Sequence, residues 1–171
     1  AGDHVLGASI VFELRPWDRL RASPPINRLP MSPSAFHASA SEMQERLRLV
    51  FDGNYNTRWL TGTSQQGDEW IEFRFLEPTD MAHIRLWMHE RSFGDYPRGL
   101  VIDSTRDGMT YTELYQGRGF PRLLLGMINN SNFVPIDISL PANESRAIRL
   151  RQTHTSETFY WSIHEIELWR R

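Results

Sequence analysis

The 171-residue sequence contains no cysteine and no lysine. The lack of cysteine excludes disulfide bonds, thiol nucleophiles, zinc–thiolate sites and iron–sulfur clusters. The lack of lysine excludes a Schiff-base mechanism and a lysine-dependent phosphate loop. All 19 basic residues are therefore arginine, a bias that we ascribe to codon usage in a G+C-rich, bacterial genome.

Long apolar runs, a strong net charge and catalytic signatures are also missing. No segment approaches the roughly 20 apolar residues of a membrane helix, so the sequence predicts no membrane span. The net charge of −2 provides no basic field, so nucleic acid is not an expected partner. The sequence has no Gly-x-Ser-x-Gly elbow, no His-x-x-x-His pair and no glycine-rich phosphate loop, and we predict that the protein is not an enzyme.

Apolar residues make up 40% of the sequence. From residue 36 onward, the chain consists mainly of short segments in which apolar and polar residues alternate. Such alternation is typical of antiparallel strands that pack on one face. Asp107-Gly108 lies between two of these segments and predicts a tight hairpin. Residues 41–50 are the one candidate for a short helical turn, with Ser41 as its cap and Leu47 and Val50 turned inward. The sequence therefore predicts an all-β antiparallel sandwich. The alternating segments are residues 70–75, 83–88, 134–140, 147–151 and 165–169.

Residues 1–34 differ from this pattern. Val5–Leu14 could form a strand, and the proline-rich stretch that follows favours an extended, irregular path. We interpret residues 1–34 as an amino-terminal strand and proline-rich connector, and residues 35–171 as the sandwich domain. The alternative is that residues 1–34 have no function of their own.

The densest motif lies at residues 49–59, where Asp52, Asn54 and Thr57 place three hard oxygen donors in one tight loop around Gly53. Hard oxygens on a curled backbone suit Ca²⁺. An Asp-Gly-Asn sequence by itself also forms plain turns, so a metal site would need a second segment to complete it.

The carboxyl end supplies that segment, and with the other motifs it resembles the discoidin family, the type C domains of coagulation factors V and VIII. It equally resembles the related galactose-binding-like carbohydrate-binding modules. The resemblance implies a jelly-roll sandwich of eight antiparallel strands with a structural cation at one end. It is carried, in order, by residues 38–41, 51–54, 57–59, 67–73, 95–99, 104–108, 147–150 and 161–166.

The resemblance also implies the ligands of a structural Ca²⁺. Side chains would come from Asp52, Thr57 and Glu165. Backbone carbonyls would come from Leu49, Asn54, Thr57 and His164. The alternative is a relative that keeps the turn without the ion, with Glu165 paired to Arg58.

Ligand binding in this family belongs to variable loops at one rim, which here are residues 60–68, 89–98, 117–133 and 153–160. Two of these loops combine aromatic rings with histidine and arginine, which can pack on a sugar face and donate to its hydroxyls. Alternatively, Phe159 and Tyr160 belong to the core. The candidate ligand-binding residues are His89, Arg91, Phe93, Tyr96, His154 and Tyr160.

The third loop contains an apolar run at residues 120–128. It could be buried under the sandwich or dock another protein, while membrane insertion is disfavoured because only Arg118 and Arg122 flank it. We predict a non-catalytic, extracytoplasmic module that binds a glycan as part of a larger secreted or membrane-associated protein. A protein–protein docking domain is the alternative, and for it residues 15–33 and 120–128 would form the contact surface.

Overall fold

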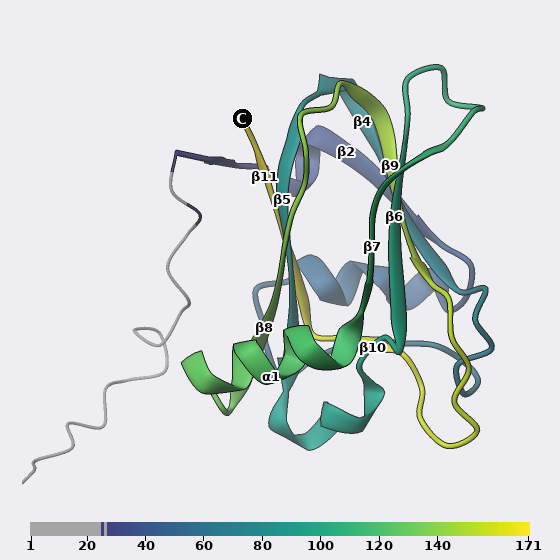
Figure 1. Cartoon of the computed structure of the whole chain (residues 1–171), viewed down its shortest axis with the longest axis vertical. Helices are drawn as coiled ribbons and strands as arrows, with labels where there is room; N and C mark the ends of the chain where they lie inside the picture. The colour runs from purple at the N-terminus through teal and green to yellow at the C-terminus, as the bar shows by residue number, and fades with distance from the viewer. Residues whose placement is uncertain (1–24, 26) are drawn as a thin grey trace, which may run out of the picture.

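The computed structural model describes residue 25 and residues 27–171. The predicted strand Val5–Leu14 and most of the predicted connector lie outside the described residues. The described chain forms a sandwich of two antiparallel sheets (Figure 1). One sheet has the order β1 (Leu29–Pro30), β11 (Glu165–Arg170), β5 (Met81–His89), β8 (Phe133–Ser139). The other has the order β2 (Phe36–Ala40), β4 (Trp70–Thr79), β9 (Ser145–Gln152), β6 (Gly99–Thr105), β7 (Thr112–Arg118).

This architecture confirms the predicted all-β sandwich. Eight of the strands in the two sheets have five or more residues, in agreement with the eight strands that the resemblance implies. The short β1 pairs with β11, and a separate two-residue pair joins β3 (Trp59–Leu60) to β10 (Ser162–Ile163). The predicted hairpin is also confirmed, because β6 and β7 pair around Gly108, whose φ is +83°.

The core lies between the sheets and follows the alternation in the sequence. On β4, Ile71, Phe73 and Phe75 face inward and are buried, and Phe73 packs edge-to-face against Phe36 on the neighbouring strand. Leu47 and Val50 are buried as well. They lie in a 3-10 helix, η3 (Gln44–Phe51), that begins after Met43. Ser41 is not its cap as predicted, because the Ser41 hydroxyl instead accepts a hydrogen bond from the backbone N–H of Trp70.

Strand β5 departs from the expected pattern of one apolar and one charged, solvated face, because all nine of its residues are buried. Its outward-facing Arg85 guanidinium lies over the rings of Trp87 and Trp169, 5.5 and 5.2 Å from their centroids. The same guanidinium is 2.7 Å from a carboxylate oxygen of Asp137 and 3.6 Å from one of Glu167. Side chains of this sheet, together with Tyr55 of the loop before β3, whose ring packs on Trp87, therefore cover much of its outer face.

A helix, α1 (Gly119–Asn129), occupies the third rim loop, where the sequence predicted no helix. The prediction was wrong because Pro121 indicates a break in the chain when it is considered from sequence alone. Pro121 lies in the first turn, where its missing N–H costs no hydrogen bond. A Cβ on Gly119 would lie 1.8 Å from the carbonyl oxygen of Pro97, and one on Gly126 would lie 2.1 Å from that of Pro135. Both glycines therefore permit close packing of α1 rather than a turn.

Two further short helices complete the fold, η2 (Pro33–Ala35) and η4 (Glu90–Asp95). η4, α1 and the loop that leads into β10 gather at the lower end of the sandwich in Figure 1. Within the described residues, no helix is both long and apolar enough to cross a bilayer.

Candidate functional site

The loop between η3 and β3 holds its oxygen atoms in a compact hydrogen-bonded turn. The Thr57 hydroxyl lies 2.9 Å from a carboxylate oxygen of Asp52 and 2.8 Å from the carbonyl oxygen of Asn54. Asp52 also accepts from the backbone N–H of Asn54, at 2.8 Å. Gly53, with a φ of +72°, allows the bend. The loop therefore concentrates a carboxylate, a hydroxyl and a carbonyl at one point.

Contacts with the last two strands tie this loop to the carboxyl end of the chain. The Nδ1 atom of His164 is 2.9 Å from the carbonyl oxygen of Tyr55, and the Tyr55 hydroxyl donates to Glu167 at 3.1 Å. Behind the loop, Trp59 and Trp161 meet with their rings perpendicular and 5.2 Å apart. The structure thus joins the two segments that the sequence analysis singled out for a metal.

The alternative prediction paired Glu165 with Arg58. Arg58 pairs instead with Asp95 of η4, at 2.9 Å. Burial raises the pKa of the Asp95 carboxyl above its ordinary value, an effect that the Arg58 charge and a hydrogen bond from Ser162 offset only in part. Glu165 itself is buried at the start of β11.

The other predicted metal ligands differ in solvent exposure. Asp52 and Asn54 are exposed, Leu49 and Thr57 are half-buried, and His164 is buried. Over residue 25 and residues 27–171, no three histidine or acidic side chains come together as a metal cluster. Any cation in this loop would therefore depend on backbone carbonyls, one hydroxyl and the Asp52 and Glu165 carboxylates, a donor set that fits Ca²⁺.

A second group of side chains forms at the rim of the sandwich around the fully buried Gln65. The Gln65 amide donates to the carbonyl oxygens of Tyr96, at 3.0 Å, and Tyr160, at 2.7 Å, and accepts from the backbone N–H of Arg98 at 3.1 Å. Its own N–H donates to the carbonyl of Phe159 at 3.0 Å. One buried amide side chain therefore holds together three loops that are distant in sequence.

Arg98 lies at the centre of this group. Its guanidinium carbon is 3.9 Å from the ring centroid of Tyr96 and 5.0 Å from that of Phe159. One guanidinium nitrogen donates to the carbonyl of Gly94 at 2.9 Å. The nitrogen Nη1 is buried and, among the described residues, has no hydrogen-bond partner. We call Gln65, Tyr96, Arg98, Phe159 and Tyr160 the rim cluster.

The predicted ligand-binding residues divide between the rim cluster and other places. Tyr96 and the 40% exposed Tyr160 belong to the cluster. His154 is exposed and pairs with the Thr153 hydroxyl at 3.2 Å, and Arg91 is exposed on η4.

Two of those residues turn toward the interior. Phe93 packs against the core. His89 is buried, accepts from the backbone N–H of Arg91 at 3.1 Å, and packs edge-to-face on Phe133. Burial lowers the pKa of His89 below its ordinary value.

The sequence analysis did not name Gln65 or Arg98 among the candidate ligand-binding residues, and it gave the core as an alternative place for Phe159. Phe159 is instead 42% exposed and stacks on Arg98. A glutamine in a polar loop carries no signal of burial. Tyr96 was a predicted ligand-binding residue in the rim loop of residues 89–98, and an arginine two residues after it was a usable signal for Arg98.

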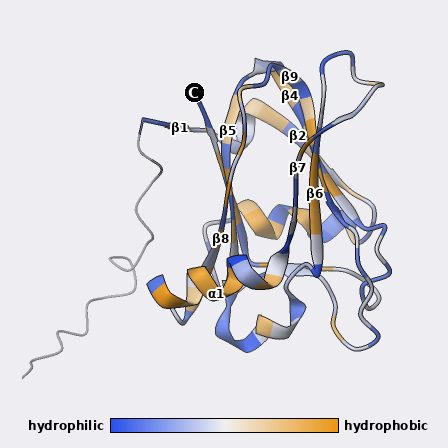
Figure 2. Ribbon diagram, viewed as in Figure 1, coloured by the Kyte–Doolittle hydropathy of each residue, from blue (hydrophilic) through white to orange (hydrophobic). Residues whose placement is uncertain are grey.

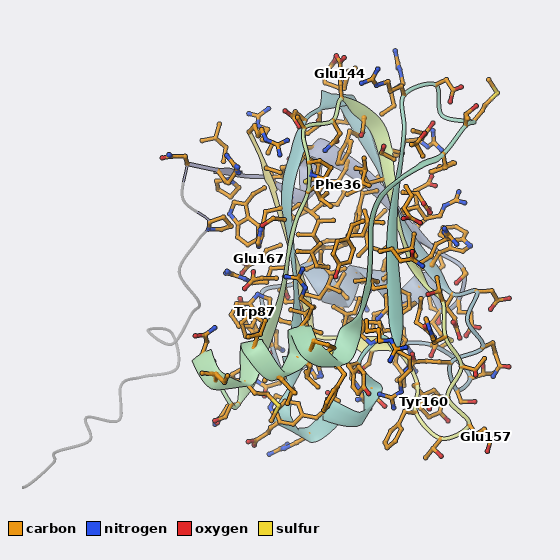
Figure 3. All side chains as sticks on the ribbon, viewed as in Figure 1. Phe36, Trp87, Glu144, Glu157, Tyr160 and Glu167 are labelled. Carbon is orange, nitrogen blue, oxygen red and sulfur yellow. The ribbon has the colours of Figure 1, made fainter. Side chains whose placement is uncertain are left out.

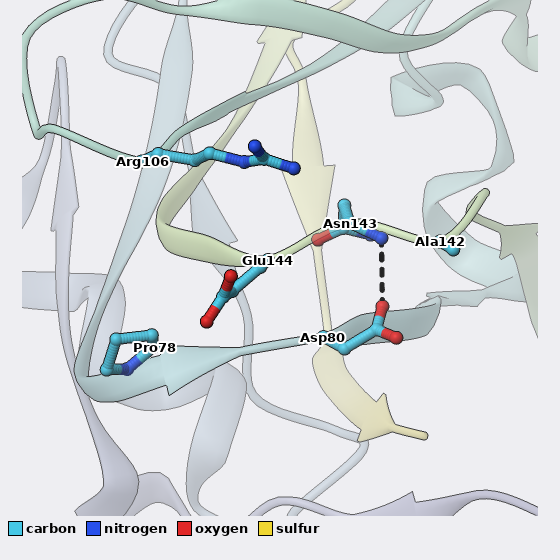
Figure 4. A pocket seen from close by; sticks show the side chains of 6 residues that line it. All are labelled: Pro78, Asp80, Arg106, Ala142, Asn143 and Glu144. Atoms are coloured by element: carbon cyan, nitrogen blue, oxygen red, sulfur yellow. Dashed lines mark hydrogen bonds between the residues drawn. The ribbon is translucent and has the colours of Figure 1, made fainter.

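An open pocket of about 480 Å³ lies away from the rim cluster (Figure 4). Figure 3 places Glu144, which lines it, at the opposite end of the sandwich from Tyr160. The Asp80 carboxylate in this pocket already accepts from the backbone N–H of Asn143, at 3.0 Å, and pairs with Arg171. No residue predicted to bind a ligand lines the pocket, whose lining residues are Pro78, Asp80, Arg106, Ala142, Asn143 and Glu144.

Solved structures with the same fold include carbohydrate-binding modules. The family 32 module of Clostridium perfringens NanJ, in complex with galactose, has 15% identity and a TM-score of 0.63, over 84% of this chain and 99% of that chain. A C. perfringens module in complex with GalNAc-β-1,3-galactose has 11% identity and a TM-score of 0.61, over 82% and 99%.

An F5/8 type C domain from Bacteroides fragilis has 18% identity and a TM-score of 0.64, over 86% of this chain and 99% of that one. No curated protein matches the chain in sequence. The family model of the F5/8 type C domain matches residues 35–166. The chain therefore belongs to the F5/8 type C domain family.

Proposed function

We propose that this domain is a non-catalytic module that binds a carbohydrate at the rim cluster. The observation that carries the proposal is Arg98, whose guanidinium contacts two aromatic rings and has one nitrogen without a hydrogen-bond partner among the described residues. Sugar recognition requires apolar faces for the C–H groups and fixed donors for the hydroxyls. The rim cluster supplies both on loops that Gln65 holds in place.

The comparisons support this proposal. Domains of this family are non-catalytic binding modules that are often attached to enzymes, and two structural neighbours were solved with galactose-containing ligands. In our proposal, a sugar displaces the exposed ring of Phe159 from the guanidinium, so that Nη1 donates to a hydroxyl and Tyr160 packs on the sugar face. We further propose that the domain works outside the cytoplasm as part of a larger protein.

Substitutions in the rim cluster test the proposal. We expect Arg98→Met, which keeps an apolar stem without the donors, to weaken galactose or N-acetylgalactosamine binding by about tenfold or more, since a hydrogen bond to a charged group contributes about 1.5–3 kcal/mol. Phe159→Ala should also change affinity. Isothermal titration calorimetry against both sugars and a wider glycan panel measures the effect.

The matched control is Met109→Ala, at the exposed tip of the β6–β7 hairpin. Its affinity should equal that of the wild type, and the melting temperatures of all variants report their folding. If no glycan binds the wild type, or if folded Arg98→Met binds as tightly, the rim cluster is not a sugar site.

We also propose that the loop of residues 52–57 holds a structural Ca²⁺ with Glu165. Support comes from the oxygen donors gathered around Thr57 and from the contacts that join this loop to the last strands. A bound ion would link the first loop to the carboxyl end and so stabilise the folded state. Ca²⁺ chemistry here is structural and supplies no catalysis.

Thermal unfolding checks the calcium proposal. We expect excess Ca²⁺ to raise the melting temperature relative to EGTA, because a ligand of the folded state stabilises it by about 2.7 kcal/mol at a concentration of 100 Kd. Asp52→Ala should lose this response. Glu144→Ala, which removes an exposed carboxylate at the other end of the molecule, should retain it. Identical curves with Ca²⁺ and EGTA would contradict the proposal.

A docking function has its own supporting observation, the apolar face of α1. Of its other predicted surface, residues 15–33, the structure describes only residue 25 and residues 27–33, so residues 120–128 carry most of the support.

A further inference from the structure

Much of helix α1 is coloured as hydrophobic in Figure 2, and four of its apolar side chains are exposed. Phe120, Leu124 and Ile128 follow one another at intervals of four residues, with exposed fractions of 49%, 44% and 82%. Residues at this spacing lie on one face of a helix, here over about 12 Å of its axis. The opposite face, with Leu123 and Gly126, is buried. We call Phe120, Leu124, Ile128 and the adjoining, 59% exposed Leu125 the α1 stripe.

The α1 stripe begins at the rim cluster. The ring of Phe120, in the first turn of α1, lies 5.9 Å from the ring of Tyr96. Tyr96 in turn lies against the guanidinium of Arg98. The aromatic rings of the proposed sugar site therefore continue, through Tyr96 and Phe120, into the apolar α1 stripe.

The shape of the α1 stripe indicates what covers it. It is one helix face wide and consists of four side chains, whereas a stable protein interface takes about 800 Å² and 20–30 residues from each partner. Helix α1 has no acidic residue, and Arg122 turns its guanidinium toward the carbonyl of Asp137, at 3.1 Å, and the Tyr115 ring. A narrow, uncharged track suits a single hydrocarbon chain better than a folded partner.

We propose that the ligand is an amphiphilic glycoside, whose sugar occupies the rim cluster and whose hydrocarbon chain lies along the α1 stripe. The inference rests on the proposed sugar site and names the chemical class of its ligand. It explains why an apolar helix face remains exposed next to a polar binding site, since the two would serve different ends of one molecule.

A pair of glycosides with the same sugar and different tails tests the inference. Calorimetry compares methyl β-D-galactoside with octyl β-D-galactoside below its micelle concentration, and repeats the pair for N-acetylgalactosamine. We expect the octyl compound to bind the wild type at least about tenfold more tightly, because each CH₂ group removed from water contributes to affinity. Octyl tetraethylene glycol ether, which has the tail without the sugar, should bind far more weakly than the octyl glycoside.

Substitutions then separate the two halves of the site. Ile128→Asp, and the milder Ile128→Ser if the first variant unfolds, should abolish the advantage of the octyl tail and leave methyl galactoside affinity unchanged. Met109→Asp, also on a highly exposed residue, should keep the advantage. Arg98→Met should weaken both glycosides.

Each contrary result has a distinct meaning. Equal affinity for the methyl and octyl glycosides would overturn the inference and leave the proposed sugar function intact. An advantage that persists in folded Ile128 variants, or a sugar-free ether that binds as tightly as the octyl glycoside, would also overturn it. If no glycoside binds, both the proposed sugar site and the inference are contradicted.

Discussion

The Trp59→Ala variant is expected to lose about 3–5 kcal/mol of its free energy of unfolding. Trp59 is fully buried, packs edge-to-face on Trp161, and donates its indole N–H to the carbonyl of Glu42 at 3.1 Å. Truncation removes the buried ring, leaves a cavity between the first loop and the last strands, and deprives the Glu42 carbonyl of its donor. Urea unfolding followed by far-ultraviolet circular dichroism measures the loss.

Two further variants show whether packing is the cause. Trp59→Phe keeps an aromatic ring and should lose much less stability than Trp59→Ala. Tyr160→Ala removes a half-exposed ring at the rim, and its loss should stay below about 1 kcal/mol because far less surface is uncovered. If Trp59→Ala unfolds at the same urea concentration as the wild type, Trp59 does not join the two ends of the core.

The second large effect is expected at Glu72, where Glu72→Gln should cost about 2–3 kcal/mol at neutral pH. Glu72 is 5% exposed on β4 and accepts from Arg149 at 2.7 Å, from Arg74 at 2.9 Å and from Tyr111. The amide cannot neutralise the two arginines. The expected loss is smaller than for a fully buried pair because Arg74 and Arg149 reach solvent and can rehydrate.

The pH dependence of stability provides an independent check on Glu72. Burial by itself raises the pKa of this carboxyl, but hydrogen bonds from Tyr111 and Arg149 and the charges of Arg149 and Arg74 outweigh it and hold the pKa below its ordinary value. A depressed pKa stabilises the folded state above the unfolded pKa, near 4.5, and this contribution disappears as the pH falls through the folded pKa.

The wild type should therefore lose this contribution progressively below about pH 4.5. Glu72→Gln has no carboxyl to titrate, so the stability difference between the two proteins should shrink as the pH falls. Chemical unfolding at a series of pH values measures it. A difference that stays constant down to pH 2 would show that the arginine contacts do not lower the pKa of Glu72.

The sandwich was predictable because its signals are local. Alternating residues such as Ile71 and Phe73 show which face of a strand is buried, and the Asp107-Gly108 pair shows where the chain reverses. Period and turn chemistry depend only on neighbours in the sequence. The loop of residues 52–57 was predictable for the same reason, since Asp52, Asn54 and Thr57 hydrogen-bond to one another within six residues.

Helix α1 was not predictable from local signals. Gly119 and Gly126 indicate breaks when only the chain is considered, and their packing role depends on the carbonyls of Pro97 and Pro135, which other segments supply. Arg85 shows the same limit, because Trp169, Asp137 and Glu167, which help to bury it, lie on neighbouring strands.

By itself, the sequence determined that the chain is an all-β domain without cysteine, and that residues 52–57 gather oxygen donors in one loop. The tertiary structure alone brought together the rim cluster, which we propose as the ligand site. The rim cluster combines Gln65, Arg98 and Phe159, which lie on three loops and meet through long-range hydrogen bonds and ring contacts. Nothing in the local sequence encodes such distances, because they depend on how the two sheets pack and bring their connecting loops to one end.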